Sequence, residues 1–422
     1  MLLLIILLLL LLALGAPIYI ALALPALITL AVNGVEPLVF AQRMFGGIDK
    51  FALMAIPLFI FAATLMGKGG MAQRILVLAD VLVGRFYGGT AVGTVLSCLF
   101  FGALSGSSPA TVVAVGGITY PMLLGNNYGK KFSMGLVTSA SSLALLIPPS
   151  ITMIVYASST GTSVGRLFMA GVGPGIVLAI GFILYSVWYS YKYNIRITSE
   201  ITGRQMWHAF KDASWALGVP VIILGGIYAG IFTPTESASV AAAYAIIIGL
   251  FVYKELDLKT LFETCKSSAL LTGQVMILCA SAAVLSWMLS LSQAQLLFTD
   301  VLEPFLGSPT IVLIIMVIIL IIFGMFIDPT PFVLLLAPLF APIANMIGLD
   351  LIHLGIIMVA GGAIGMFTPP FGLNLFVGMA TFREDFASVA MSCIPFIVIG
   401  IIFLFIIAFA PDITMWLPNR LW

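Results

Sequence analysis

The sequence predicts an all-α polytopic membrane protein that is built from an inverted repeat, with two re-entrant helical hairpins and two broken transmembrane helices. Three observations indicate this fold. Of the 422 residues, 62% are hydrophobic and only 8% are charged, and the mean hydropathy is +1.22. Apolar runs of about 20 residues, long enough to cross ~30 Å of hydrocarbon, recur along the chain. Prolines interrupt these runs at matching places in the two halves.

The repeat is visible in the spacing of the prolines. The separation of Pro148-Pro149 from Pro369-Pro370 equals that of Pro174 from Pro395, whereas Pro109 and Pro331 are one position further apart. A slippage of a single position reconciles the two offsets. Paired interruptions at corresponding positions of two halves indicate the binding site of a secondary transporter.

The apolar runs place the elements in order. We expect spanning helices near 2–33, 51–67, 130–160, 165–191, 215–232, 236–253, 268–291, 350–381 and 387–410. Two of these, 130–160 and 350–381, are broken at their Pro–Pro pairs, while 70–86 and 294–306 are less apolar and are expected to be tilted, short or interfacial. The hairpins are expected near 88–124 and 309–347, because each has two arms of only about 15–18 residues around a polar tip. Backbone exposed at such a tip is tolerated only inside protein or beside water.

Charge predicts opposite orientations for the two hairpins. Arg85 and Lys130-Lys131 flank the first hairpin, whereas Asp300, Glu303 and Asp350 flank the second. Basic residues favour the cytoplasmic side of a membrane. The first hairpin is therefore expected to enter from the cytoplasm and the second from outside.

The tips carry the chemistry. At the first tip we expect Ser108 to be a helix N-cap and Pro109 the first helical residue, and Thr330-Pro331 repeats this arrangement at the second. Interrupted helices offer free N–H groups to an anion and free carbonyls to a cation. Serine and threonine hydroxyls and the Asn374 amide add neutral oxygens, which suit Na⁺ and favour Na⁺ over proton coupling. Asp328 is the main titratable exception, and it could ligate a cation, cap a helix or pair structurally.

Other features favour structural roles. Glu236 follows Thr233 by three residues at an expected helix start, as the acid of a capping box does. The four cysteines are far apart in apolar surroundings and are expected to be buried: Cys98, Cys265, Cys279 and Cys393. The sequence also speaks against two other function classes, because it contains no cluster of His, Asp, Glu or Cys typical of an enzyme or a zinc site. Its net charge of +1 gives no indication of nucleic-acid binding.

Seven stretches together point to a family. The chain resembles the large membrane subunit (M or DctM-like) of TRAP transporters, the tripartite ATP-independent periplasmic carriers. The matching stretches are Gly15-Ala16-Pro17-Ile18, Ala55-Ile56-Pro57-Leu58-Phe59-Ile60, Ser105-Gly106-Ser107-Ser108, Ile147-Pro148-Pro149-Ser150-Ile151, Leu167-Phe168-Met169-Ala170-Gly171, Gly230-Ile231-Phe232-Thr233-Pro234-Thr235-Glu236-Ser237-Ala238 and Thr368-Pro369-Pro370-Phe371-Gly372-Leu373-Asn374-Leu375-Phe376. They occur in the family's order and cover nearly the whole chain.

The resemblance implies an elevator-type carrier in a bacterial inner membrane, not an enzyme. It implies Na⁺-coupled uptake of a small organic acid anion, such as a C4-dicarboxylate, sialic acid or another sugar acid, delivered by a periplasmic substrate-binding protein. A small membrane subunit is the second implied partner, and it is expected to be a separate chain because this sequence begins directly at its first spanning helix. A stand-alone Na⁺/dicarboxylate symporter that needs no binding protein is the alternative.

The resemblance also implies a division of the chain and three sets of site residues. The scaffold would comprise 1–86 and 215–307, the transport domain 87–191 and 308–422, and a cytoplasmic linker with a surface helix 192–214. The first Na⁺ site would use Ser105, Gly106, Ser107, Ser108, Pro148 and Ser150. The second would use Asp328, Thr330, Thr368, Gly372 and Asn374. Substrate would lie between the tips at Ser107, Ser108, Ser150, Thr330 and Asn374.

Overall fold

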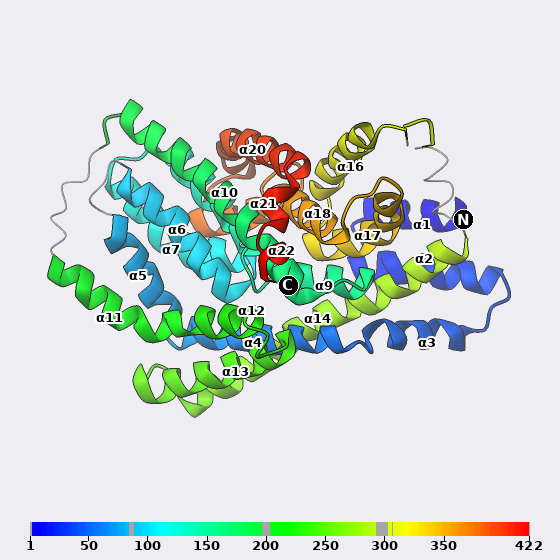
Figure 1. Cartoon of the computed structure of the whole chain (residues 1–422), viewed down its shortest axis with the longest axis horizontal. Coiled ribbons are helices and arrows are strands. Elements are labelled where there is room, and N and C mark those ends of the chain that lie inside the picture. The colour runs from blue at the N-terminus through cyan, green and yellow to red at the C-terminus, as the bar shows by residue number, and fades with distance from the viewer. Residues whose placement is uncertain (1, 84–87, 196–202, 293–302, 306, 422) are drawn as a thin grey trace.

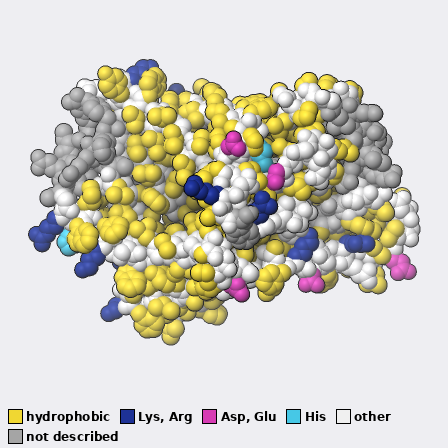
Figure 2. All heavy atoms as spheres, in the orientation of Figure 1, with side chains coloured by type: hydrophobic (Ala, Val, Ile, Leu, Met, Phe, Trp, Pro, Cys, Tyr) yellow, Lys and Arg dark blue, Asp and Glu magenta, His cyan; other side chains and the backbone are white. Residues whose placement is uncertain are grey.

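The computed structural model describes residues 2–83, 88–195, 203–292, 303–305 and 307–421, and all regular secondary structure in these ranges is helical (Figure 1). Within them, eight helices are long and apolar enough to cross a membrane. Apolar side chains cover much of the face in Figure 2, where charged side chains are sparse. The expected multi-pass, all-α architecture is therefore confirmed. Most of the expected segment 294–306, including Asp300, lies outside the described residues, as do the end of the expected segment 70–86 and Arg85.

The helices of the first half precede a linker that lies partly outside the described residues. They are α1 (Leu2–Ala13), α2 (Ile18–Val32), α3 (Pro37–Ile48), the 3₁₀-helix η1 (Phe51–Met54), α4 (Ala55–Lys68), α5 (Met71–Val83), α6 (Gly89–Ser105), α7 (Ser108–Gly125), α8 (Lys130–Ala140), the 3₁₀-helix η2 (Ser141–Leu145), α9 (Ile151–Thr160) and α10 (Val164–Lys192).

The second half follows the same plan. It contains α11 (Gly203–Pro220), a π-helical turn (Val221–Gly225), α12 (Gly226–Tyr228), α13 (Pro234–Ile247), a second π-helical turn (Ile248–Val252), α14 (Leu258–Leu291), the 3₁₀-helix η5 (Glu303–Phe305), α16 (Pro309–Gly324), α17 (Pro329–Met346), α18 (Leu351–Gly365), α19 (Leu373–Phe382), α20 (Phe386–Phe409), α21 (Pro411–Met415) and α22 (Pro418–Leu421). In Figure 1 the α6–α7 and α16–α17 pairs lie on opposite sides of the central α10 and α18.

Helix boundaries recur at the offset that the prolines predict. Helix α8 begins at Lys130 and α18 begins at Leu351, and this separation equals that of the two Pro–Pro pairs. Both Pro–Pro peptide bonds, 148–149 and 369–370, are cis. The broken helices expected at 130–160 and 350–381 are therefore confirmed as α8–η2–α9 and α18–α19.

The single helix expected over 2–33 is wrong. Gly15 adopts φ +73°, which a residue with a side chain rarely does, and its N–H donates to the Leu12 carbonyl. Pro17 then precedes α2 as its N-cap residue. Helices α1 and α2 pack against each other as a pair. Uniform apolarity hides this break, because one glycine and one proline end a helix without changing the hydropathy.

Two other helices begin earlier than their apolar runs. Helix α11 begins at Gly203, so the expected surface helix and the expected span from 215 form one helical segment that ends at Tyr228. Helix α14 begins at Leu258 rather than 268, because the Asp257 side chain accepts a hydrogen bond from the Thr260 N–H at 2.7 Å. Hydrogen bonds from the Thr260 side chain and backbone lower the pKa of Asp257. The first turns of α11 and α14 are helical although they are polar, so the hydropathy of the sequence places the starts of these helices too late.

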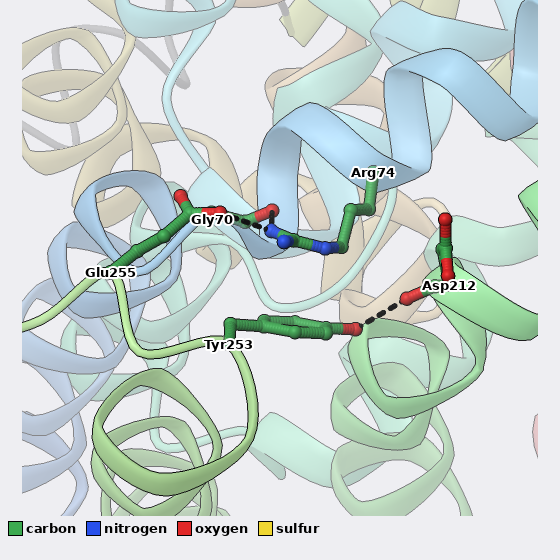
Figure 3. A network of polar contacts seen from close by, with 5 residues as sticks. All are labelled: Gly70, Arg74, Asp212, Tyr253 and Glu255. Atoms are coloured by element: carbon green, nitrogen blue, oxygen red, sulfur yellow. Dashed lines mark hydrogen bonds and ion pairs between the residues drawn. The ribbon is translucent and has the colours of Figure 1, made fainter.

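A polar network joins the two halves where α5 begins (Figure 3). The Arg74 Nη1 lies 2.6 Å from Glu255 Oε1 and donates to the Gly70 carbonyl at 2.8 Å. The guanidinium also stacks over the Tyr253 ring at 3.8 Å, and the Tyr253 hydroxyl donates to the Asp212 carbonyl at 2.7 Å. Planar stacking combined with several directed donors is a property of arginine that lysine lacks. The network therefore ties α5 to α11 and to the loop before α14.

Two smaller expectations were also tested. Thr233 and Glu236 form the expected capping box: the Thr233 N–H donates to Glu236 Oε2 at 2.8 Å and the Glu236 N–H to Thr233 Oγ1 at 3.3 Å. Cys98, Cys279 and Cys393 are buried, but Cys265 is exposed on α14, so the expectation that it is buried is wrong.

Candidate functional site

The first tip is a tight turn between α6 and α7. Gly106 adopts φ +57°, and Ser107 is extended, with φ −128° and ψ 116°. The Ser107 hydroxyl accepts a hydrogen bond from the Ala110 N–H at 3.5 Å, so Ser107 and not Ser108 is the N-cap of α7. The Thr111 hydroxyl donates to the Ser107 carbonyl at 2.8 Å and lies 3.3 Å from Ser105 Oγ. These bonds hold the tip in one shape.

Close backbone packing places this tip against the first break. A Cβ on Gly102 would lie 2.6 Å from the Ala144 Cα, and one on Gly106 would lie 2.7 Å from the Pro149 carbonyl oxygen. Only glycine fits at either position without movement of a backbone. The first tip and the break at 148–150 are thus in contact, as the family resemblance implies.

The second tip repeats this packing. A Cβ on Gly365 would collide with the Gly324 carbonyl, and Gly324 and Gly365 correspond to Gly102 and Ala144 at the same two offsets that relate the prolines. The Phe371 N–H at the second break donates to the Met325 carbonyl at 3.2 Å. The second tip and the break at 368–374 are therefore also in contact.

The start of α17 differs from the prediction. Asp328, with φ −58° and ψ 145°, is the N-cap residue and Pro329 is the first helical residue, so the helix begins before the expected Thr330-Pro331. Asp328 and Thr330 are half-buried. Pro329 packs on α18 at Gly362, where a Cβ would lie 3.1 Å from Pro329 Cβ.

Backbone groups shape the second break. The Thr368 hydroxyl donates to the Ile364 carbonyl at 2.7 Å, and the Gly372 N–H donates to the Thr368 carbonyl at 3.2 Å. A Cβ on Gly372 would lie 2.5 Å from the Met366 carbonyl oxygen, which also accepts the Asn374 N–H at 2.9 Å. Several carbonyls thus converge at this turn.

The side chain of Asn374 links the second break to the first half. Its Nδ2 donates to Ser108 Oγ at 2.7 Å and to the Thr138 carbonyl at 3.0 Å. Asn374, Ser108 and Ser150 are each fully buried. These hydrogen bonds join Asn374 to the first tip and α8, whereas the family resemblance groups it with Asp328 and Thr330. Sequence reasoning did not single out Thr138, because its role appears only when α8 and α19 come together.

Several buried side-chain oxygens at the two breaks and on α8 have no hydrogen-bond partner among the described residues, including Thr138 Oγ1, Ser150 Oγ and Asn374 Oδ1. A buried polar atom without a partner costs free energy and requires an explanation such as a bound ion or water. No group of three or more His, Cys, Asp or Glu capable of holding a metal occurs among the described residues. The unpartnered atoms named here are hydroxyl and amide oxygens.

Comparison with solved structures concerns the fold. The fold is similar to that of the Alcanivorax borkumensis YdaH transporter, with a TM-score of 0.58 at 13% identity over 88% of this chain and 87% of that one. At this identity the likeness shows a shared fold and nothing further.

The family follows from the sequence match. Residues 5–413 match the DctM component of the tripartite ATP-independent periplasmic transporters, and the chain belongs to this family. It is 37% identical to the C4-dicarboxylate TRAP transporter large permease protein DctM of Rhodobacter capsulatus, over 96% of both chains. It is 39% identical, over 96% of its length, to the isethionate TRAP transporter permease protein DctMQ of Oleidesulfovibrio alaskensis, and spans 64% of that relative. The resemblance deduced from the seven stretches is thus confirmed.

Proposed function

We propose that this chain is the large permease of a carrier that takes up a small organic acid anion, driven by a Na⁺ gradient. The observation that carries the proposal is the buried polar region at the two helix breaks, where Asn374 bonds Ser108 and where Thr138 Oγ1, Ser150 Oγ and Asn374 Oδ1 lack partners among the described residues. Neutral oxygens at broken helices coordinate Na⁺ in secondary transporters, and helix N-termini meet anionic substrate groups.

The proposal includes two Na⁺ ligand sets. We assign the first Na⁺ site to Ser105–Ser108 and 148–150, with Asn374 Oδ1 added from the second half. Asp328, Thr330, Thr368 and Gly372 supply the second. Substrate would lie between the tips, against Ser107, Ser108, Ser150, Thr330 and Asn374.

Family membership supports the remaining parts of the proposal. A tripartite carrier has a small membrane subunit and a periplasmic binding protein as partners, and the bacterial inner membrane as its location. The names of two relatives concern a C4-dicarboxylate and isethionate, both small organic anions; sialic acid and other sugar acids are further candidates. A stand-alone symporter is not favoured by membership in a tripartite family. We further propose that the transport domain moves against the scaffold as an elevator.

Uptake into proteoliposomes tests the proposal. The large permease, its small subunit and its binding protein are reconstituted, and uptake of labelled succinate, isethionate and sialic acid is measured under an inward Na⁺ gradient. We expect uptake of one of these acids that disappears when K⁺ replaces Na⁺ and persists with a protonophore. Uptake that continues without Na⁺ but stops with the protonophore would contradict Na⁺ coupling. Equal uptake without the binding protein would instead support the stand-alone alternative.

A further inference from the structure

A second polar site lies away from the tips. A cleft of about 210 Å³ lies between α3, α9, α14 and α17. Helices α3 and α14 fall in the predicted scaffold, whereas α9 and α17 fall in the predicted transport domain. The cleft therefore lies on the predicted boundary between the two parts.

The lining of the cleft is rich in hydrogen-bond donors. Its polar side chains are Lys50, Ser158, Ser159, Ser286, Trp287 and Ser290, and none of the described lining residues is acidic. Outside the lining, Arg43 stacks over the Trp287 ring at 4.6 Å. Asp49, next to Lys50 in the chain, is exposed and does not line the cleft. An ammonium, hydroxyls and an indole N–H suit a carboxylate or sulfonate.

The backbone is interrupted beside this cleft. At the offset of the Pro–Pro pairs, the counterpart of α14 in the first half is the segment formed by α3, η1 and α4. Helix α14 is one unbroken helix of 34 residues, whereas its counterpart breaks at Lys50, whose backbone is extended at φ −133° and ψ 129°. Non-helical backbone at membrane depth is tolerated where it lines a water-filled cavity or is covered by protein. This departure from the repeat places the exposed Lys50 at an interruption of the backbone beside the cleft.

The Lys50 ammonium is placed so that it can bind a ligand in addition to its partner within the protein. Its Nζ donates to the Ser158 carbonyl at 2.6 Å, near the end of α9, where carbonyls lack helical partners. The side chain is nevertheless exposed. An ammonium has three donors, so this bond leaves two for another ligand.

We propose that the cleft is a vestibule that attracts small organic anions through Lys50, between the two moving parts of the protein. The inference rests on the proposed function and deepens it, because it places the passage of the anion at a site other than the tips. Lys50 acts there as a specificity-determining cation, and the serine hydroxyls and Trp287 complete a donor-rich surface for a carboxylate or sulfonate.

Charge-selective labelling tests this inference without knowledge of the substrate. Ser286→Cys is introduced into the full chain, and its reaction rates with anionic sulfonatoethyl and cationic trimethylammonioethyl methanethiosulfonate are measured by mass spectrometry. The first reagent carries a two-carbon sulfonate. We expect the anion-to-cation rate ratio at position 286 to fall about fivefold with Lys50→Gln and to be kept with Lys50→Arg. Glutamine retains a donor for the Ser158 carbonyl, so a purely structural role of Lys50 predicts no change.

The native chain supplies the control. Cys265 is exposed on the same helix, α14, and lies about 32 Å along the helix axis from position 286. That separation is about four Debye lengths at physiological salt, so its rate ratio should not respond to Lys50. In the protein that keeps Lys50, raising the salt concentration should bring the anion-to-cation rate ratio at position 286 toward the ratio at Cys265. This measurement tests the proposal even if Lys50→Gln does not fold. If neither salt nor Lys50→Gln changed the anion-to-cation rate ratio at position 286, the proposal would be overturned. Labelling is done in K⁺ buffer, so its outcome is independent of Na⁺ coupling.

Discussion

The Asn374 amide donates a hydrogen bond to the Ser108 hydroxyl at 2.7 Å across 266 positions of sequence. Both side chains are fully buried. The bond joins the second broken helix to the tip of the first helix pair, so the two halves share one polar junction. Any movement that separates α19 from α7 must break it or carry both helices together, and the close packing of these helices favours common movement.

The first prediction concerns this amide. Asn374→Ala leaves Ser108 and the Thr138 carbonyl without their buried donor, at a cost of about 1–3 kcal/mol per group. We expect the Na⁺ concentration for half-maximal uptake to rise at least tenfold. Thr381→Ala on the same helix is the matched control, because the Thr381 hydroxyl bonds only within α19, to the Val377 carbonyl at 2.8 Å. Wild-type Na⁺ dependence of Asn374→Ala would exclude the amide from the site.

The second prediction concerns the crossing of α16 and α18. In Gly365→Ala the new methyl group collides with the Gly324 backbone, which has no flexible side chain to yield. We expect a loss of about 1–3 kcal/mol in stability, seen as a lower midpoint of thermal unfolding in detergent. Gly117→Ala on α7 meets open space and should be neutral or raise the midpoint, since alanine favours helix by about 1 kcal/mol. Equal midpoints of thermal unfolding for Gly365→Ala and Gly117→Ala would show that α16 and α18 can move apart without a loss of stability.

Local signals in the sequence account for the parts of the fold that were predicted correctly. The Pro–Pro pairs break α8–α9 and α18–α19 because proline removes an N–H and clashes with the preceding turn. The Thr233–Glu236 capping box was predicted for the same reason, since both residues act within one helical turn. The N-caps at the two tips were predicted too late in the chain, because serine, threonine and aspartate all cap helices and only the backbone geometry decides between neighbouring candidates.

The rest depended on contacts between distant segments. Nothing near Asn374 in the sequence indicates that it meets Ser108 and Thr138, because periodicity and propensity contain no information on which helices pack together. The cleft at Lys50 was missed for a related reason. A single lysine near a helix end is ordinary, and its setting becomes evident only when α9 and α14 lie beside it.

The third prediction separates helix capping from ion binding at the first tip. Ser107→Ala removes a cap that is worth about 0.5–2 kcal/mol, and it also removes an oxygen from the proposed Na⁺ site. Ser163→Ala removes an equivalent cap from α10, where the Ser163 hydroxyl accepts a hydrogen bond of 3.4 Å from the Arg166 N–H. Ser163 belongs to neither tip. We expect both to lower stability, but only Ser107→Ala to raise the Na⁺ requirement for uptake, by about 5- to 150-fold. Thr330 lies inside α17 and is not its N-cap residue, so Thr330→Ala should raise the Na⁺ requirement at the second tip without removing a cap. Normal Na⁺ dependence in both tip variants would leave close packing as the role of the tips.

The last prediction tests the opposite orientation of the two helix pairs. Basic residues flank the first pair and acidic residues the second, so their outer ends should face the cytoplasm and the periplasm respectively. Gly125 at the end of α7 and Gly307 before α16 are exposed glycines, and a Cβ at either meets open space. Cysteine at each position should therefore fold normally and react with an impermeant maleimide, Gly307→Cys in intact spheroplasts and Gly125→Cys only in inverted vesicles. Exposed Cys265, near Lys259 and Lys266 and therefore predicted to be cytoplasmic, provides an internal reference that should react together with position 125. Reaction of positions 125 and 307 from the same side would contradict the inversion, and it would require the substrate path between the tips to be redrawn.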